Sequence, residues 1–285
     1  INCYCTAPTN EAVRVISNLT GNKYEKTIYS LLGLVLLEED GGKAKIIQKG
    51  KPTINVYDVV ILDEASMIGD ELLIKIYEQL KKCPSLRIIY VGDNAQLPPI
   101  NTNIELKNNE PTESTVFKLS NKVELTQVQR VAKDNPIIGI VTPIRMNLSS
   151  PTDCFERITQ VKDESGVQFF ENSGEFIDLI YSDFKSDLAK NNPNYVRVIA
   201  YTNETVNKLN SKIRQSIFDN KTPDEYIASE ILIVASPVFE KVNKHVANIL
   251  FTTGERIEVI FAEKTEEDEF EMEVWRLTVK KYDST

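Results

Sequence analysis

Histidine and cysteine are scarce in this chain: its 285 residues include one histidine and four cysteines. The cysteines, Cys3, Cys5, Cys83 and Cys154, match neither the spacing of a disulfide framework nor that of a zinc site. The single histidine, His245, supports no catalytic or metal hypothesis by itself. The sequence therefore argues against a disulfide scaffold and a zinc protein, and we expect Cys3 and Cys5 to be small buried hydrophobic side chains on one strand.

A long apolar segment is missing as well. No hydrophobic run approaches the roughly 20 residues that cross a bilayer as a helix. The first residues, Ile1 to Cys5, also lack the charged-then-apolar order of a signal peptide. We therefore predict a cytoplasmic protein with no membrane partner.

Positive charge is in deficit, with 33 lysines and arginines against 42 aspartates and glutamates and a net charge of −9. Proteins that adhere broadly to nucleic acid normally present a basic surface. The charge balance argues against broad non-specific binding, but it leaves a narrow nucleic-acid groove open.

The length of the chain allows two domains, each with its own core. Its 41% hydrophobic and 26% charged residues are typical of a soluble globular protein. The sequence starts without methionine inside a predicted strand and ends just after another, at 274–279. We therefore predict that it is a fragment of a longer protein.

Two adjacent acids follow the most apolar short run near the start of the chain. Residues Val59 to Leu62 predict a buried parallel strand, which delivers Asp63 and Glu64 to the carboxyl edge of a sheet. Open α/β sheets place their chemistry at that edge. One acid would hold magnesium through its hydration shell, and the other would orient an attacking water. An acidic helix start favoured by the helix dipole is the alternative.

A second strong strand, 86–91, runs into Gly92 and a polar turn that contains Asp93 and Gln96. These side chains should reach the same sheet edge as the acid pair, where a glutamine can sense a terminal phosphate. A turn stiffened by two prolines is the alternative. Further on, Arg130 follows a predicted short strand at 123–126, from which an arginine could reach a γ-phosphate; a surface salt bridge is the other interpretation.

Two strands are each followed by threonine and asparagine at a helix start. Residues 1–7 predict a strand that leads through Pro8 into Thr9-Asn10 and a helix ending at Gly21. Residues 195–201 predict the central strand of a second α/β region, followed by Thr202-Asn203 and another helix. The amides and hydroxyls at such starts could hold phosphates of one nucleic-acid strand. Plain helix caps are the alternative in both places.

The remaining pattern completes a mixed α/β protein. We expect a small hairpin within 33–55, helices starting at 69–70, 135–136 and 173, a strand at 167–170, and mostly antiparallel β structure beyond residue 230.

Five of these segments, in this order, resemble consecutive motifs of the superfamily 1 helicases and are most similar to the RecD-like, Dda-like group. They are Ala7-Pro8-Thr9, Leu62 to Met67, Val91 to Pro99, Leu125 to Arg130 and Ala200 to Asn203. The resemblance spans most of residues 1 to 260, and its Asp-Glu-Ala-Ser and Gly-Asp-x-x-Gln-Leu-Pro-Pro segments are highly specific.

The resemblance implies an α/β fold of two RecA-like parallel-sheet domains, both incomplete here, plus the start of an antiparallel β insertion. The expected divisions are 1–122 with the hairpin insertion at 33–55, then 123–235, then a partial β module at 236–285. The implied activity is an ATP-dependent DNA helicase that uses ATP and Mg²⁺ and moves 5′ to 3′ on single-stranded DNA. A non-hydrolysing RecA-like accessory module and an RNA helicase remain alternatives.

Residue roles follow from the same resemblance. Asp63 would engage Mg²⁺ through water, Glu64 would act as the catalytic base, Gln96 would couple the γ-phosphate to DNA, and Arg130 would contact that phosphate. The nucleotide-binding set is thus Asp63, Asp93, Gln96 and Arg130, and the DNA-binding set is Pro8, Thr9, Asn10, Tyr29, Thr202 and Asn203.

The sequence also departs from the family. It contains no Gly-x-x-x-x-Gly-Lys-[Ser/Thr] phosphate-binding loop. Tyr29 stands where many relatives have histidine. We therefore expect the isolated chain to bind ATP poorly and not to unwind DNA.

Overall fold

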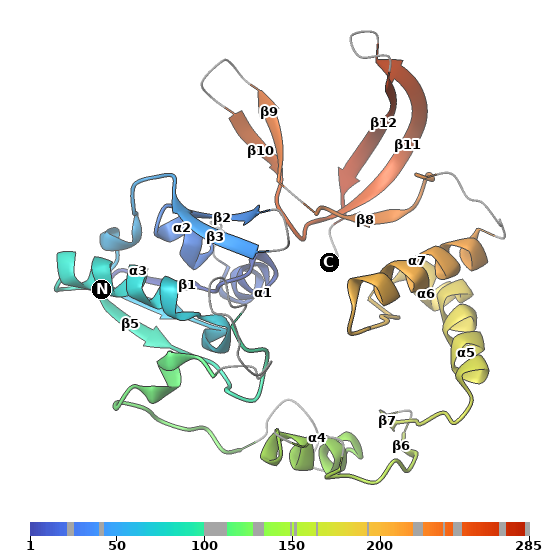
Figure 1. Cartoon of the computed structure of the whole chain (residues 1–285), viewed down its shortest axis with the longest axis horizontal. Coiled ribbons are helices and arrows are strands. Elements are labelled where there is room, and N and C mark those ends of the chain that lie inside the picture. Colours follow the sequence, from blue (N-terminus) through green and yellow to red (C-terminus); the bar gives the residue numbers. More distant parts are fainter. Residues whose placement is uncertain are drawn as a thin grey trace. The chain divides into compact units, whose positions relative to one another are not determined.

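The computed structural model (Figure 1) describes residues 1–21, 26–39, 43–99, 113–127, 134–148, 150, 153–163, 165–192, 194–218, 225–235, 237–241, 247–267 and 272–282. The chain forms two compact units. Unit 1 comprises 1–133 and 141–154, and unit 2 comprises 134–140 and 155–285. The sequence-based divisions at 122 and 235 stay predictions.

Unit 1 is organised by a parallel three-stranded sheet in the order β1-β4-β5, which confirms the expected α/β class. Its strands are β1 (Cys3–Thr6), β4 (Val59–Leu62) and β5 (Arg87–Tyr90). Helix α3 (Asp70–Lys82) packs on the sheet through its predicted apolar face, because Leu72 and Ile76 share one buried cluster with Val60 and Leu62. Val60 and Leu62 of the central strand are fully buried in this core.

Two helices follow β1. Helix α1 (Asn10–Thr20) ends at Gly21, whose φ of 67° is the left-handed C-cap that the sequence predicts. Helix α2 (Ile28–Leu31) is tied to the end of β1, since the Ile28 amide donates to the Ala7 carbonyl over 3.0 Å.

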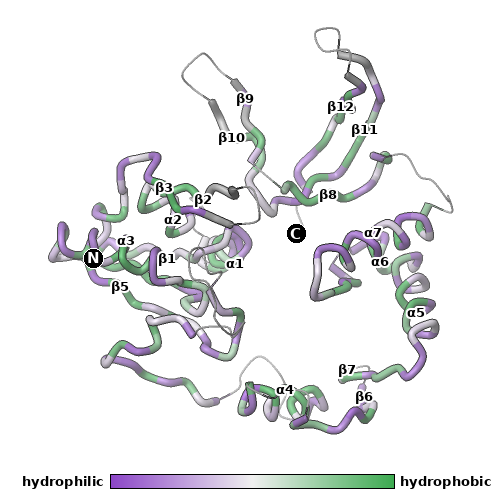
Figure 2. The backbone as a smooth tube through the Cα atoms, viewed as in Figure 1, coloured by the Kyte–Doolittle hydropathy of each residue, from purple (hydrophilic) through white to green (hydrophobic). Residues whose placement is uncertain are grey.

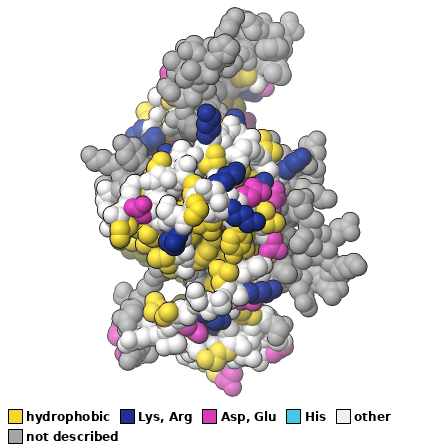
Figure 3. All heavy atoms as spheres, turned by 90° about the vertical axis from the view of Figure 1, so that its left-hand side faces the viewer, with side chains coloured by type: hydrophobic (Ala, Val, Ile, Leu, Met, Phe, Trp, Pro, Cys, Tyr) yellow, Lys and Arg dark blue, Asp and Glu magenta, His cyan; other side chains and the backbone are white. Residues whose placement is uncertain are grey.

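The expected hairpin is confirmed as β2 (Leu34–Glu39) paired antiparallel with β3 (Lys43–Gln48). Short 3-10 turns complete unit 1 at η1 (Ile54–Val56), η2 (Ala65–Met67) and η3 (Thr115–Lys118). Figure 3 shows hydrophobic side chains gathered on one face of this unit. Exposed apolar residues of β5 and its continuation include Ile89 and Val91.

Helix α4 (Ile137–Met146) begins where Asn135-Pro136 predicts it and crosses the division between the units at Ile140. Unit 2 continues with the small hairpin β6 (Gln160–Lys162) and β7 (Ser165–Val167). Its helices are α5 (Ser173–Lys185), α6 (Asp187–Asn191) and α7 (Asn203–Ile217).

The end of unit 2 is antiparallel β structure, as expected. Strands β8 (Ile231–Ile233), β11 (Arg256–Glu267) and β12 (Met272–Lys281) form one sheet, and β9 (Val238–Lys241) pairs with β10 (Ala247–Phe251). Both β11 and β12 carry hydrophobic and hydrophilic residues, as the green and purple segments of Figure 2 show. Cross-strand ion pairs such as Arg276 with Glu263 line this hairpin. In the described part of the chain, no helix is both long and apolar enough to cross a membrane.

Several local predictions are wrong. Residues 195–201 form no strand, because in the described parts of unit 2 no segment pairs with them, and a strand needs a hydrogen-bonded neighbour. The segment 123–126 is likewise unpaired, and the strand expected at 167–170 ends at Val167. Cys3 is exposed and Cys5 is half-buried instead of both being buried, because they lie on the face of β1 opposite the buried Tyr4 and Thr6.

Candidate functional site

The three parallel strands β1, β4 and β5 of unit 1 deliver their loops to one edge of the sheet. Thr6, Leu62 and Tyr90 are register partners at the carboxyl ends of β1, β4 and β5. The alignment continues one residue further, because the Asp63 amide donates to the Thr6 carbonyl (2.9 Å) and the Val91 amide to the Leu62 carbonyl (2.8 Å). The loops that carry Pro8, Asp63 and Asp93 therefore start side by side.

The acid pair lies in a tight turn between β4 and η2. Glu64 has φ 52° and ψ 42°, a left-handed conformation that is uncommon for a residue with a side chain. Such a conformation costs about 1–3 kcal/mol and tends to occur at functional sites. The Asp63 Oδ1 atom accepts the Glu64 amide over 2.9 Å. The turn thus holds both carboxylates, each half-buried, at the sheet edge.

The neighbouring loop packs against this turn through Gly92. A Cβ atom at Gly92 would lie 2.8 Å from the Ala65 amide nitrogen and 3.1 Å from the Ala65 Cβ. The Ala65 amide also donates to the Val91 carbonyl over 2.9 Å. A glycine is required because any side chain would force the two loops apart.

Asp93 shapes the second loop through both of its carboxylate oxygens. Oδ1 accepts the Ala95 amide at 2.9 Å, and Oδ2 accepts a hydrogen bond from the guanidinium of Arg145 in α4. Partial burial alone would raise the pKa of Asp93, but the Arg145 and Ala95 contacts outweigh it and hold the pKa below its ordinary value. Direct contact of Asp93 with a nucleotide stays a prediction.

Gln96 lies three residues further on, and its amide donates to the Asp93 carbonyl over 3.1 Å. Its side chain is exposed. The structure therefore brings Asp63, Glu64, Asp93 and Gln96 to one edge, as the strand pattern predicts. Arg130 lies outside the described residues.

A magnesium site at this edge fits the donors that the structure provides. Within the described ranges, no three histidine, cysteine, aspartate or glutamate side chains gather to form a metal cage. Mg²⁺ usually keeps several waters and takes one or two carboxylates together with phosphate oxygens. Asp63 uses Oδ1 in the turn, so its Oδ2 remains to bind the hydration shell of such an ion.

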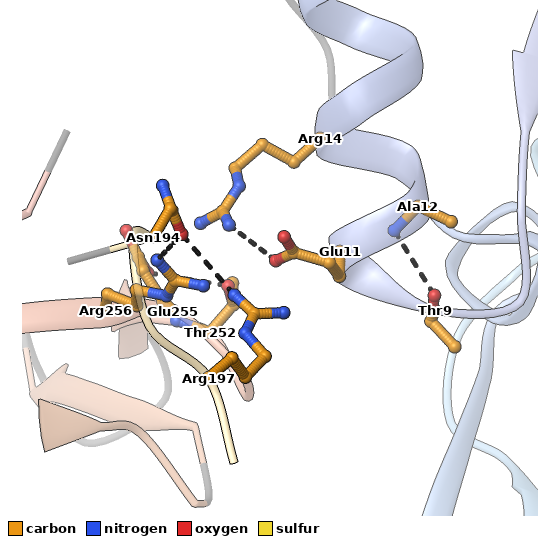
Figure 4. Close-up of polar contacts among 9 residues, drawn as sticks. All are labelled: Thr9, Glu11, Ala12, Arg14, Asn194, Arg197, Thr252, Glu255 and Arg256. Atoms are coloured by element: carbon orange, nitrogen blue, oxygen red, sulfur yellow. Dashed lines mark hydrogen bonds and ion pairs between the residues drawn. The ribbon is translucent and has the colours of Figure 1, made fainter. Parts of the chain in front are cut away.

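The first Thr-Asn pair, Thr9 and Asn10, lies at the N-terminus of helix α1. The Thr9 hydroxyl oxygen caps α1 by accepting the Ala12 amide over 3.3 Å, as Figure 4 shows. Because the Thr9 hydroxyl oxygen is the acceptor in this cap, its proton can be donated to another group. Glu11 in the same turn forms an ion pair with Arg14. Asn10 is exposed and Pro8 is half-buried.

Tyr29 lies in α2 and is half-buried against the core. Burial, and then the nearby carboxylate of Glu71, raise the pKa of Tyr29. The tyrosine is therefore neutral over the physiological range. Contact between its ring and nucleic acid stays a prediction.

The second Thr-Asn pair belongs to unit 2. The Thr202 hydroxyl oxygen accepts the Thr205 amide at 3.2 Å and caps α7, while the two threonine hydroxyls lie 2.9 Å apart. Asn203 is exposed in the first turn. Elsewhere in the unit, the Asn194 amide oxygen accepts from Arg256 at 2.6 Å and from Arg197 at 3.4 Å (Figure 4).

Two residues at the unit 1 edge were missed by sequence reasoning. Arg145 lies 52 residues after Asp93, and no spacing signals their contact. Ser66 is buried, and its hydroxyl has no hydrogen-bond partner in the described structure. Ser66 lies in the Asp-Glu-Ala-Ser segment, but only its burial in the described structure shows it to be a polar group without a partner.

The sequence of this chain is similar to those of several known proteins. Residues 1–102 match the family described as "AAA domain". The chain is 32% identical over 301 aligned residues to the ATP-dependent DNA helicase dda of Enterobacteria phage T4, an alignment that covers 97% of this chain and 62% of that protein. The ATP-dependent RecD2 DNA helicase of Deinococcus radiodurans is 32% identical over 132 residues, which cover 46% of this chain and 16% of that protein.

Solved structures give a weaker likeness. The Pif1 helicase from Bacteroides, in complex with ADP-AlF3 and ssDNA, aligns with 98% of this chain and 72% of its own length, at 16% identity and a TM-score of 0.47. The chain spans about three fifths of the phage relative.

Proposed function

We propose that this chain, whose resemblance to the superfamily 1 Dda- and RecD-like helicases is confirmed by its two helicase relatives, is the motor portion of an ATP-dependent DNA helicase. The proposed activity couples ATP hydrolysis to 5′-to-3′ movement along single-stranded DNA. The observation that carries the proposal is the packing of the Asp63-Glu64 turn against the Gly92–Gln96 loop at the edge where α/β sheets bind nucleotides.

Hydrolysis requires a group that takes a proton from the attacking water. Glu64 takes this role, because its half-buried carboxylate follows β4 at the sheet edge where the neighbouring Gly92 loop packs. Asp63 would hold Mg²⁺ through its hydration shell, and the ion would supply charge neutralisation at the phosphate oxygens. Gln96, in the adjacent loop, hydrogen-bonds to the terminal phosphate and couples it to DNA. Arg130 stabilises charge on the same phosphate.

DNA is held by its backbone at two helix starts. At Thr9 and Thr202, hydroxyls and first-turn amides donate to phosphate oxygens, with Asn10 and Asn203 beside them. Pro8 sets the approach to the first start, and Tyr29 offers an aromatic surface near it. Backbone contacts of this kind tolerate any base sequence, which a translocating enzyme needs.

Substitution of the proposed base tests this function in the complete product of the gene that encodes this chain. Glu64→Gln should lower DNA-stimulated ATP hydrolysis by about 10²–10⁴-fold, the usual contribution of a general base, while nucleotide binding persists. Glu78→Gln is the matched control, because Glu78 is an acid on α3 that makes only an exposed contact with Lys75.

The wild-type rates with matched single-stranded DNA and RNA belong to the same experiment. Stimulation by DNA supports the proposal. Equal loss of activity in both glutamine variants, stimulation by RNA alone, or a wild-type protein that never hydrolyses ATP would contradict it.

A further inference from the structure

The contact between Asp93 and Arg145 connects two parts of unit 1 that are far apart in sequence. Asp93 closes the turn that carries Gln96. One of its carboxylate oxygens accepts a hydrogen bond from the Ala95 amide, and its backbone carbonyl accepts one from the Gln96 amide. Its other carboxylate oxygen accepts a hydrogen bond from the Arg145 guanidinium. One side chain therefore sets the shape of the phosphate-sensing loop and fastens that loop to α4.

Helix α4 is the element by which the chain passes between the two units. Its first residues, 137–140, group with unit 2, and the residues from Val141 onward group with unit 1. The turns of the helix are joined by backbone hydrogen bonds, except that Pro143 inside α4 has no amide proton to donate. Arg145 lies in the last turn, on the unit 1 side of the division.

Stability alone does not explain the pair. The Arg145 and Asp93 side chains are 49% and 28% exposed, and exposed ion pairs contribute little to folding. Asn147 already satisfies two carbonyls at the end of α4, because its side chain donates to the Pro143 carbonyl at 2.9 Å and its amide donates to the Ile144 carbonyl at 3.1 Å. Arg145 is therefore not needed as a helix cap.

We propose that Arg145 is a positioning residue that couples the nucleotide-sensing loop to α4, acting through Asp93. A shift of Gln96 with the state of the terminal phosphate displaces Asp93, three residues away, and Asp93 moves the last turn of α4. This role rests on the proposed helicase function and deepens it. Because coupling is reciprocal, DNA binding to the helicase also changes the loop through the same contact.

Removal of the guanidinium tests the coupling in the complete gene product. Arg145→Gln should leave the KM for ATP and the affinity for single-stranded DNA without nucleotide within about 2-fold. It should lower the DNA-stimulated kcat by about 10-fold, within the usual range of allosteric coupling. Arg145→Lys, which keeps the charge, should recover most of the kcat.

The partner is tested by Asp93→Asn. Asparagine keeps the acceptor for the Ala95 amide but removes the charge that attracts Arg145. The double variant Asp93→Asn/Arg145→Gln should be no slower than either single variant, because both remove the same contact. Arg276→Gln is the matched control, since Arg276 forms an exposed ion pair with Glu263 in the β11–β12 hairpin.

Three outcomes would overturn the coupling role. These are an Arg145→Gln enzyme as fast as Arg276→Gln, additive losses in the double variant, or a joint loss of thermal stability, KM and DNA affinity, which would mark a purely structural residue. A wild-type enzyme whose ATP hydrolysis ignores DNA would instead contradict the proposed function itself.

Discussion

The two Thr-Asn helix starts are nearly identical locally and differ in what precedes them. Thr9 and Thr202 have φ, ψ of −110°, 150° and −111°, 147°, and each caps the amide three residues on. Each is followed by Asn-Glu, and the glutamate pairs with a base one turn later, Arg14 or Lys208. The cap is therefore built by a few neighbouring residues in either unit.

The preceding segments are unlike each other. Ala7 is fully buried at the end of a strand hydrogen-bonded to β4, and its carbonyl accepts the Ile28 amide. Tyr201 is 103% exposed at the end of a segment without a strand partner. The comparison teaches that capping is a local property, whereas a strand exists only where another segment supplies its hydrogen bonds.

The largest expected change in stability distinguishes the buried segment that ends at Ala7 from the exposed segment that ends at Tyr201. Ala7→Asp should destabilise the chain by about 4 kcal/mol or more, because it places an unpaired carboxylate in the core. Tyr201→Asp should change the free energy of unfolding by less than about 0.5 kcal/mol, since the site is exposed. Urea denaturation followed by circular dichroism measures both. Similar losses in the two variants would show that the segments are equally packed.

A smaller change in stability tests whether the Thr9 and Thr202 helix caps contribute equally. Thr9→Ala and Thr202→Ala should each cost about 1 kcal/mol, because each removes the acceptor of one orphan amide. Thr→Ser at either position should restore stability, since serine caps as well as threonine. Thermal unfolding of the four variants gives the comparison, and a difference above about 1 kcal/mol between the two alanine variants would refute local equivalence.

The smallest expected effect is the pH-dependent stability that comes from two carboxylates paired with basic side chains, Asp93 in unit 1 and Glu255 in unit 2. For both, burial raises the pKa, but hydrogen bonds from Arg145 or Lys281 and from backbone amides bring it below the ordinary value. A folded-state pKa below the unfolded one stabilises the protein above about pH 4, and this contribution is lost as the pH falls through the folded pKa. Each should contribute less than about 1 kcal/mol because the sites are partly exposed.

Titration of the two side-chain carboxyl signals by NMR measures these values. Arg145→Gln should raise the pKa of Asp93 and leave that of Glu255 unchanged. An Asp93 pKa that does not respond would mean that Arg145 does not hold the carboxylate in solution.

Much of unit 1 could be predicted because its signals are local. The apolar run before Asp63 predicts β4, the periodic apolar residues of α3 predict a covering helix, and Gly21 predicts the end of α1. The placement of Asp63, Glu64, Asp93 and Gln96 at one edge follows from parallel strands alone. The segment 195–201 has the same apolar character as β4 and was predicted wrongly, since propensity does not supply a partner strand.

The sequence by itself determined the helix starts, the parallel strands of unit 1 and the motifs that relate the chain to helicases, because each depends on residues within about one turn or strand of each other. Only the tertiary structure decided the left-handed turn at Glu64, the close approach of Gly92 to Ala65 and the contact of Asp93 with Arg145. The last two features join segments distant in the chain, and their energies arise from packing and charge across space that no local pattern encodes.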